Sequence, residues 1–276
     1  MRRKAIHHPR LCLALVTVIA LHVALTASAQ VNSAQMKQTR TIEIGEFSQQ
    51  VHLSLEVGDT LRVVLPSTPS TGYSWHVAGN STVLKAKGSG ITPAPQKNVG
   101  GAGRQSLAFV VAATGQDDLM LNYSRPWEKG KPAARQYTIG VTVADAGAAN
   151  TASPVQVAGG VLQGTYSGKL PCADCSALLT SIAFYAEGSP QSPAGYYVRT
   201  STYMGAPKGN VVSIDAGHYL LQKGTPDTPD RTVFSLQSNT SDNLESYLLQ
   251  GDSLVPLDSD GNPIHAPFDM SLKKQP

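Results

Sequence analysis

Apolar and polar residues alternate along most of this chain in short runs, and turn-forming residues separate one run from the next. Alternation with a period of two places apolar side chains on one face of a β-strand, whereas an amphipathic helix needs a period of about 3.6 residues. Helical spacing is hard to find in this sequence, so the pattern predicts an all-β protein. In the first half, the runs that are typical of strands are 41–44, 51–57, 61–65, 73–77, 83–86, 105–112, 119–123 and 136–143.

The first 29 residues have the layout of a secretory signal peptide. Basic residues precede an apolar run at 11–25, and a small-residue cleavage site follows at 27–29. The basic residues are Arg2, Arg3, Lys4 and Arg10. We expect cleavage before Gln30 and a periplasmic or secreted mature chain, with an uncleaved anchor as the alternative. The apolar run is short for a bilayer span and no second candidate follows it, so no stable membrane insertion is expected after cleavage.

Removal of the signal segment takes the balance of charges from 22 basic against 19 acidic residues to 18 against 19. The basic excess is therefore a property of the export signal. Nothing in the mature chain indicates nucleic acid as a partner.

The mature chain is long enough for two ordinary domains. The 41% of apolar residues in the full sequence, with abundant Gly and Pro, suits β structure rather than disorder. The stretch 145–154 is small and polar and has no periodicity that would bury a face, so we place a linker at 145–158. This divides the chain into a first domain at 36–144 and a second at 159–272.

Three loops of the first domain are rich in turn-forming residues. The first contains two prolines, which restrict its backbone before any partner binds. The second is rich in glycine, and the third contains an Arg-Pro-Trp sequence. The residues that we single out are Thr68, Pro69, Ser70, Thr71, Gly72 and Tyr73 in the first loop, Gly101, Ala102 and Gly103 in the second, and Arg125, Pro126 and Trp127 in the third.

In this order, the motifs P-S-T-G-Y-x-W, G-x-G and R-P-W resemble the chagasin family of cysteine-peptidase inhibitors, over residues 39–144. One motif alone is a weak signal, whereas the three together are specific. Two positions depart from the family's pattern: Thr68 stands in place of Asn, and Arg104 in place of a second adjacent Gly. The resemblance implies an immunoglobulin-like β-sandwich, which the strand pattern also fits, with the loops gathered on one surface. It implies a papain-like cysteine peptidase as the partner.

Inhibition of this kind is obstruction of an open catalytic cleft. We expect residues 68–73 to act as a wedge, because Thr71 and Gly72 have little bulk and the two prolines limit the entropy lost on ordering. The resemblance places Ser70, Thr71 and Gly72 at the catalytic centre of the peptidase.

The other two loops are expected to flank the wedge. The small residues at 101–103 suit a close approach to a wall of the cleft. Arg125 and Trp127 look like anchors, and Pro126 fixes the turn between them. Taken singly, such loops usually only turn the chain. We expect Trp75 in the core, because it is spaced by two from Tyr73, and Trp127 exposed, because polar residues surround it.

Two stretches of the second half resemble the N-terminal domain of the NlpE family of envelope proteins, which is named in connection with copper resistance and envelope-stress signalling. They are 164–175 (GTYSGKLPCADC) and 254–261, within a similarity that covers 161–265. The resemblance implies a small antiparallel, lipocalin-like β-barrel. Alternating runs at 195–200, 211–214, 218–221, 233–236 and 246–249 are consistent with it.

Cys172 and Cys175 are the only cysteines left after signal cleavage. A disulfide is the expected state in an oxidising compartment. The alternatives are a redox dithiol, which usually opens a helix in a βαβ unit, and a Cu(I) site, which requires that both thiolates stay reduced. We otherwise expect no metal.

These observations predict an exported, reversible, non-covalent inhibitor of papain-like cysteine peptidases, joined to an NlpE-like barrel of unknown role. The alternative is an envelope stress-sensing or copper-handling protein in which the sandwich is an interaction module. The sequence contains no HExxH, GxSxG or phosphate-loop motif, so we expect neither an enzyme nor a cofactor.

Overall fold

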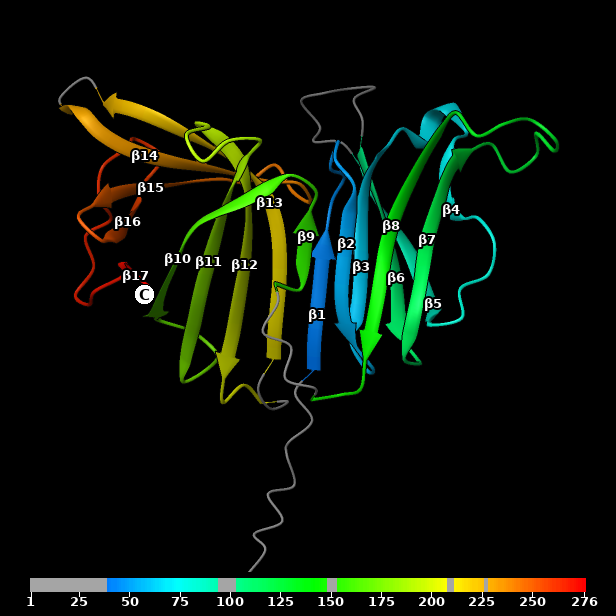
Figure 1. Cartoon of the computed structure of the whole chain (residues 1–276), viewed down its shortest axis with the longest axis horizontal. Coiled ribbons are helices and arrows are strands. Elements are labelled where there is room, and N and C mark those ends of the chain that lie inside the picture. Colours follow the sequence, from blue (N-terminus) through cyan, green and yellow to red (C-terminus); the bar gives the residue numbers. More distant parts are fainter. Residues whose placement is uncertain (1–38, 94–102, 148–152, 208–210, 226–227) are drawn as a thin grey trace, which may run out of the picture. The chain divides into compact units, whose positions relative to one another are not determined.

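The computed structural model describes residues 39–93, 103–147, 153–207, 211–225 and 228–276 (Figure 1). Within these ranges the regular structure consists of β-strands and one turn of 3-10 helix, η1 (Pro69–Thr71), which confirms the all-β prediction. A helix that could cross a membrane is not found in these ranges. The predicted signal peptide at 1–29 lies outside the described residues.

The first half of the chain forms a sandwich of two β-sheets. One sheet runs in the order β5 (Leu84–Thr92), β6 (Gly103–Val111), β3 (Thr60–Ser67) and β1 (Thr39–Ile44). The other runs in the order β4 (Ser74–Val77), β7 (Gly115–Ser124), β8 (Arg135–Ala144), β2 (Val51–Glu56) and β9 (Val155–Val157). The pairs β1–β3 and β2–β8 are parallel, and the other neighbours within these sheets are antiparallel. The predicted immunoglobulin-like sandwich is confirmed.

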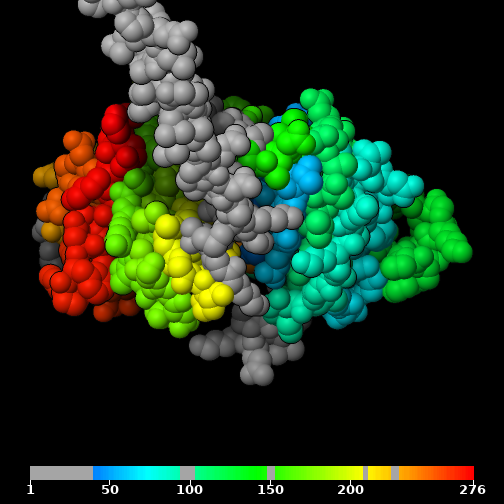
Figure 2. Space-filling view, turned by 90° about the horizontal axis from the view of Figure 1, so that it is seen from below, coloured from blue at the N-terminus to red at the C-terminus, as the bar shows by residue number. Residues whose placement is uncertain are grey.

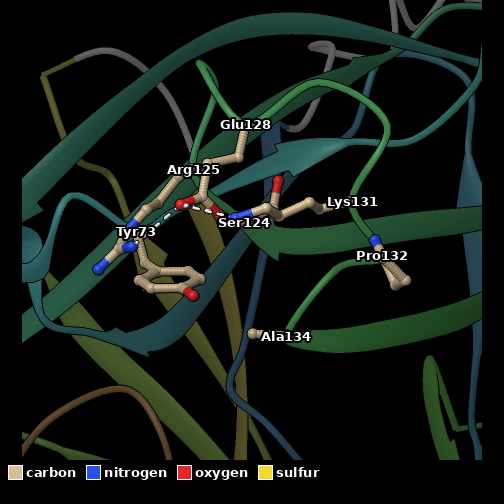
Figure 3. A pocket seen from close by; sticks show the side chains of 7 residues that line it. All are labelled: Tyr73, Ser124, Arg125, Glu128, Lys131, Pro132 and Ala134. Atoms are coloured by element: carbon tan, nitrogen blue, oxygen red, sulfur yellow. Dashed lines mark hydrogen bonds and ion pairs between the residues drawn. The ribbon is translucent and has the colours of Figure 1, made fainter.

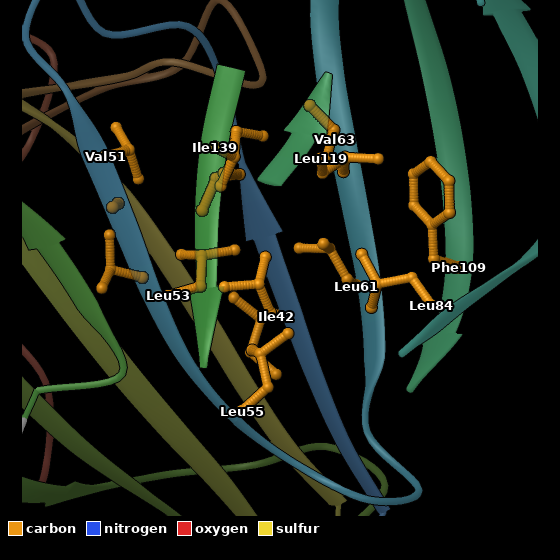
Figure 4. Close-up of a cluster of buried hydrophobic side chains, with 14 of the residues drawn as sticks. Ile42, Val51, Leu53, Leu55, Leu61, Val63, Leu84, Phe109, Leu119 and Ile139 are labelled. Atoms are coloured by element: carbon orange, nitrogen blue, oxygen red, sulfur yellow. The ribbon is translucent and has the colours of Figure 1, made fainter. Parts of the chain in front are cut away.

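The core of the sandwich lies between the two sheets. Val51, Leu53 and Leu55 of β2 have no exposed area, whereas the residues between them are exposed or half-buried. Figure 4 shows these side chains in one cluster with residues of β3, including Leu61 and Val63. Full burial of each such side chain contributes about 1.5–3 kcal/mol to the stability of the fold. Burial of the alternating apolar residues is therefore the main interaction that holds the two sheets together.

The predicted strands correspond to β1–β8, and the largest difference is at β5. The predicted strand ends at residue 86, whereas β5 continues to Thr92. Residues 85–92 are exposed because β5 pairs only with β6 and lies at the edge of its sheet. An edge strand of this kind carries little apolar alternation, which is the signal that strand prediction uses.

The second half of the chain forms a closed antiparallel β-barrel, which confirms the second fold prediction. Its described strands are β10 (Gly160–Leu170), β11 (Ala177–Glu187), β12 (Ala194–Met204), β13 (Val211–Thr225), β14 (Thr228–Ser238), β15 (Leu244–Gln250), β16 (Ser253–Leu257) and β17 (Leu272–Lys274). Consecutive strands pair, and β17 pairs with β10 to close the ring. Aromatic side chains such as Tyr166, Phe184 and Phe234 fill the interior.

Strand β1 connects the sandwich to the barrel. It pairs in parallel with β3 on one side and with β13 on the other, and Ile42 lies opposite Ile214. Several buried residues of the barrel therefore belong to the same hydrophobic cluster as the sandwich core. They are Tyr196, Val198, Val212, Ile214 and Ala216.

Residues 155–157 lie within the stretch predicted as a linker and form β9, antiparallel to β2. Val155 and Val157 are buried, and Gln156 between them is exposed. The Tyr196 hydroxyl lies 3.3 Å from the backbone nitrogen of Val157 and 3.2 Å from its carbonyl oxygen. These residues therefore extend the sandwich at the β2 edge. Residues 148–152 of the same stretch lie outside the described residues.

The predicted disulfide between Cys172 and Cys175 is confirmed, with a Cα–Cα distance of 5.3 Å. It lies in the connection between β10 and β11. In this state neither sulfur is a thiolate that could bind copper. Across the described residues, no group of three or more His, Cys, Asp or Glu side chains gathers as potential metal ligands.

The disulfide should contribute little to global stability, because the loop that it closes is very short. Replacement of Cys172 and Cys175 by Ser together should lower the free energy of unfolding by clearly less than the ~3 kcal/mol expected for a loop of about 15 residues. Urea unfolding of the variant and the parent measures the difference. A loss above that figure would contradict the chain-entropy argument.

The burial of β9 predicts a larger effect at Val155. Val155→Ala should lower the free energy of unfolding of the full chain by about 1–3 kcal/mol, because it removes buried methyl groups from the sandwich core. Gln156→Ala, in the same strand with an exposed side chain, is the matched control and should change stability little. Equal unfolding curves for the two variants would argue against the packing of β9.

Candidate functional site

The first loop emerges from β3 and forms η1 before the chain enters β4. Two hydrogen bonds close this turn: the Thr71 amide donates to the Thr68 carbonyl (3.0 Å), and the Gly72 amide donates to the Pro69 carbonyl (2.9 Å). The Thr71 hydroxyl also donates to the Thr68 carbonyl at 2.6 Å. Pro69, Ser70 and Thr71 are exposed. The predicted wedge is therefore a compact turn with its tip in solvent.

Three aromatic residues form the base of this turn. The Tyr123 hydroxyl accepts a hydrogen bond of 2.9 Å from the Thr68 amide, and its ring stacks on Tyr73 with centroids 5.3 Å apart. Trp75, with 2% of its surface exposed, packs against Tyr123 with ring centroids 5.0 Å apart. Its indole donates to the Pro66 carbonyl at 2.9 Å. The prediction that Trp75 is in the core is confirmed, and Tyr73 lies half-buried at the base of the turn.

Arg125 connects the third loop to the first. Its Nε donates to the Thr71 carbonyl at 3.0 Å, and its guanidinium lies 4.5 Å from the centre of the Tyr73 ring. Its Nη1 donates to Glu128 at 3.1 Å, and Lys131 lies 3.4 Å from the same carboxylate oxygen (Figure 3). The hydrogen bond from Arg125, followed by the charge of Lys131, lowers the pKa of the Glu128 carboxyl. Arg125 is thus aimed at the chain's own first loop.

Trp127 lies at the tip of the third loop, in a turn that the Glu128 amide closes by donating to the Arg125 carbonyl at 3.0 Å. Pro126 occupies the second position of this turn, which its fixed φ favours. Figure 2 shows the connection between β7 and β8 projecting from the surface, and Trp127 has 66% of its surface exposed. The predicted exposure is confirmed.

The Trp127 indole also closes over Gly72. Gly72 has φ of +79°, and a Cβ at that position would lie 2.7 Å from Cζ2 of Trp127. Only glycine meets both requirements without strain. The first and third loops therefore touch through Gly72 and Trp127 as well as through Thr71 and Arg125.

Of the second loop, Gly103 is within the described residues, whereas Gly101 and Ala102 lie outside them. Gly103 is buried at the start of β6 and pairs with Ser67, one residue before the first loop begins. The register of β3 and β6 therefore places the end of the second loop next to the root of the first. Predicted residues of all three loops meet at one end of the sandwich.

Two residues that support this site were missed by sequence reasoning, Tyr123 and Gln105. Gln105 has 5% of its surface exposed, and its side-chain amide exchanges two 2.8 Å hydrogen bonds with the backbone of Trp75. Gln105 is a polar residue at one of the positions of the 105–112 alternation that face the core. This was the feature of the sequence that could have identified it. For Tyr123, the sequence showed only that the residue ends a predicted strand. That position does not indicate which group its hydroxyl contacts.

Chemically, the site offers a rigid backbone turn flanked by an exposed indole and a cation. A hollow of about 330 Å³ adjoins it, lined mainly by Tyr73, Arg125, Glu128 and Lys131. Arg125 and Glu128 form a direct ion pair in its lining. Such a surface fits the docking of a partner around the turn.

Comparisons with known proteins agree with the two resemblances. Residues 54–141 match the family described as Chagasin family peptidase inhibitor I42, and residues 166–267 match the NlpE N-terminal domain. Amoebiasin-2 of Entamoeba histolytica is 30% identical over 93 residues, which cover 33% of this chain and 76% of that protein. Chagasin of Trypanosoma cruzi is 27% identical over 93 residues, which cover 32% of this chain and 84% of that protein.

Among solved structures, the alignment with a crystal structure of a cysteine protease inhibitor from Entamoeba histolytica covers 38% of this chain and 97% of the inhibitor chain. The identity is 27% and the TM-score is 0.35.

The contact between Gly72 and Trp127 gives a direct test of the site's geometry. Gly72→Ala should displace the indole and shift the fluorescence of Trp127, and should cost about 1–3 kcal/mol of stability from the strained φ and the steric overlap. Gly79→Ala is the matched control, because Gly79 has φ of +83° but a Cβ there would meet no atom within 4 Å. Equal stability and fluorescence changes in both variants would show that the two loops do not touch.

Proposed function

The chain belongs to the chagasin family of peptidase inhibitors, and from this premise we propose that it is an exported, reversible, non-covalent inhibitor of papain-like cysteine peptidases. The observation that carries the proposal is the exposed turn at Pro69–Thr71, held by internal hydrogen bonds and by contacts from Arg125 and Trp127. A turn that is ordered before binding loses little entropy when it enters a cleft.

The turn is suited to block a peptidase and to resist cleavage. Peptidases bind substrates as extended strands, which leave backbone amides free to pair with the enzyme. In this turn the amides of Thr71 and Gly72 already donate within the loop. The peptide bonds at the tip are therefore poorly placed for attack, while the small side chains of Ser70 and Thr71 let the backbone approach a thiolate.

The flanking loops supply most of the contact area in this proposal. Trp127 offers a large apolar surface that is exposed in the free protein, a common property of interface anchors. Arg125 holds the first loop with Nε and bonds to Glu128 of its own loop with one terminal nitrogen, which leaves its remaining donors for a partner. We assign Gly101, Ala102 and Gly103 to the surface that contacts the peptidase, and the pairing of Gly103 with Ser67 supports this by placing the end of the second loop beside the first.

The wedge assignment predicts the effect of bulk at residue 71. Thr71→Arg in the full chain should abolish or severely weaken inhibition of papain, because a long charged side chain cannot enter beside the catalytic thiolate without a clash or unpaired burial. Thr114→Arg is the matched control, since Thr114 is exposed at the opposite end of β6 and should leave inhibition unchanged. Inhibition constants with thermal melts provide the measurement. A folded Thr71→Arg protein that inhibits like the parent would remove the first loop from the site.

The anchor assignment predicts a smaller loss. Trp127→Ala should weaken inhibition by about 1–3 kcal/mol, the range typical of aromatic residues at interfaces. Its melting temperature should barely change, because the side chain is mostly exposed.

A parent protein that fails to inhibit papain at high micromolar concentration while folded would refute the function itself.

A further inference from the structure

A turn of the barrel reaches the end of the sandwich that carries the loops. Residues 239–243 connect β14 to β15. The Asn239 side chain donates to the Glu46 carbonyl at 3.0 Å, just beyond the end of β1. A Cβ at Gly45 would overlap the Asn239 carbonyl and side chain, so the glycine permits this close approach. The barrel thus packs on backbone atoms of the sandwich at this point.

Arg104 extends the contact to β6. Its Nη2 lies 2.5 Å from the Asp242 carboxylate, and its Nη1 donates to the Asn239 carbonyl at 3.2 Å. The guanidinium is therefore held by two residues of one turn, through a side chain and a backbone carbonyl. The Arg104 side chain is 25% exposed. Hydrogen bonding to a charged donor makes this contact directional.

The position of Arg104 in the sheet links this contact to the inhibitory loops. Arg104 pairs with Pro66 of β3, and the next pair along the ladder is Gly103 with Ser67. Pro66 also accepts the hydrogen bond from the Trp75 indole. A contact that restrains Arg104 therefore also restrains the last residues of β3, from which the first loop emerges. It restrains the start of β6 as well, where the second loop ends.

We infer that the barrel is part of the inhibitory apparatus, and that Arg104 is the positioning residue through which its β14–β15 turn fixes the root of the first loop. The inference rests on the proposed inhibitory function and gives the second domain a role in it. The turn acts as a brace at the root of the first loop, whereas Arg125 and Trp127 contact the loop at Thr71 and Gly72. Arg104 acts through the chain's own backbone rather than by contact with the peptidase.

The test uses full-length protein and papain, with four variants. Arg104→Ala and Asp242→Ala each remove the ion pair, the double variant removes both partners, and Arg104→Asp with Asp242→Arg exchanges the charges. Arg62→Ala is the matched control, because Arg62 lies on the same sheet and its 2.9 Å ion pair is with Glu43 of the sandwich itself. Inhibition constants and amide hydrogen exchange of residues 60–67 and 103–107 in the free protein are both measured.

Each single variant should weaken inhibition by about two- to five-fold, as expected for loss of a partly exposed charged pair. The double variant should be no weaker than Arg104→Ala, the charge exchange should restore part of the affinity because Asp at residue 104 cannot donate to the Asn239 carbonyl, and Arg62→Ala should be silent. Amide exchange in the two segments should quicken in the Arg104 and Asp242 variants only.

Inhibition that falls with Arg104→Ala while amide exchange in the two segments stays at the parent rate would overturn the inference, because Arg104 would then act on the peptidase directly. Unchanged inhibition and exchange in all variants would also overturn it. If the parent protein does not inhibit papain, the proposed function fails, and the exchange rates alone then decide whether the brace exists.

Discussion

The side-chain amide of Gln105 joins the two sheets of the sandwich at the point where the candidate site begins. Strand β4 pairs with β7 on one edge only, and the Gln105 amide satisfies the Trp75 backbone from the other side. An unsatisfied polar group at such a buried position costs about 1–3 kcal/mol. The same residue lies in β6, opposite Leu65 of β3. The strands that enter and leave the first loop are therefore tied together by one buried side chain.

Much of the fold could be predicted from alternation alone, because most strands have one face toward a core and one toward solvent. The burial of Trp75 followed from the same reasoning, whereas the exposure of Trp127 followed from the polar residues around it. Strand β13 shows where this reasoning fails: Val212, Ile214 and Ala216 pack in the sandwich cluster, whereas Tyr219 faces the barrel interior. A strand with both faces covered has no single alternating pattern, so the sequence suggested two short runs where one long strand lies.

Other features depend on partners that are distant in the sequence. Val155 and Val157 lie in a short apolar alternation among small residues, and only the free edge of β2 makes them a strand. The parallel pairing of β1 with β13 likewise could not be predicted from the sequence, because nothing in either strand indicates which strand it pairs with. Motif reasoning located the loops and assigned Arg125 to the partner, but it could not show that this side chain also contacts Thr71, Tyr73 and Glu128 of its own chain.

The way in which the first loop is held separates its shape from its side-chain chemistry. The contacts that fix the turn involve backbone atoms: the Thr68 amide, the Thr68 and Thr71 carbonyls, and the glycine backbone beneath Trp127. The Ser70 side chain is exposed at the tip. Substitution among small residues at this position changes what the tip presents without disturbing how it is held. In the proposed inhibitor, selectivity among peptidases is therefore more readily encoded in the flanking residues, the indole, the cation and the strand ends near Arg104, than in the turn itself.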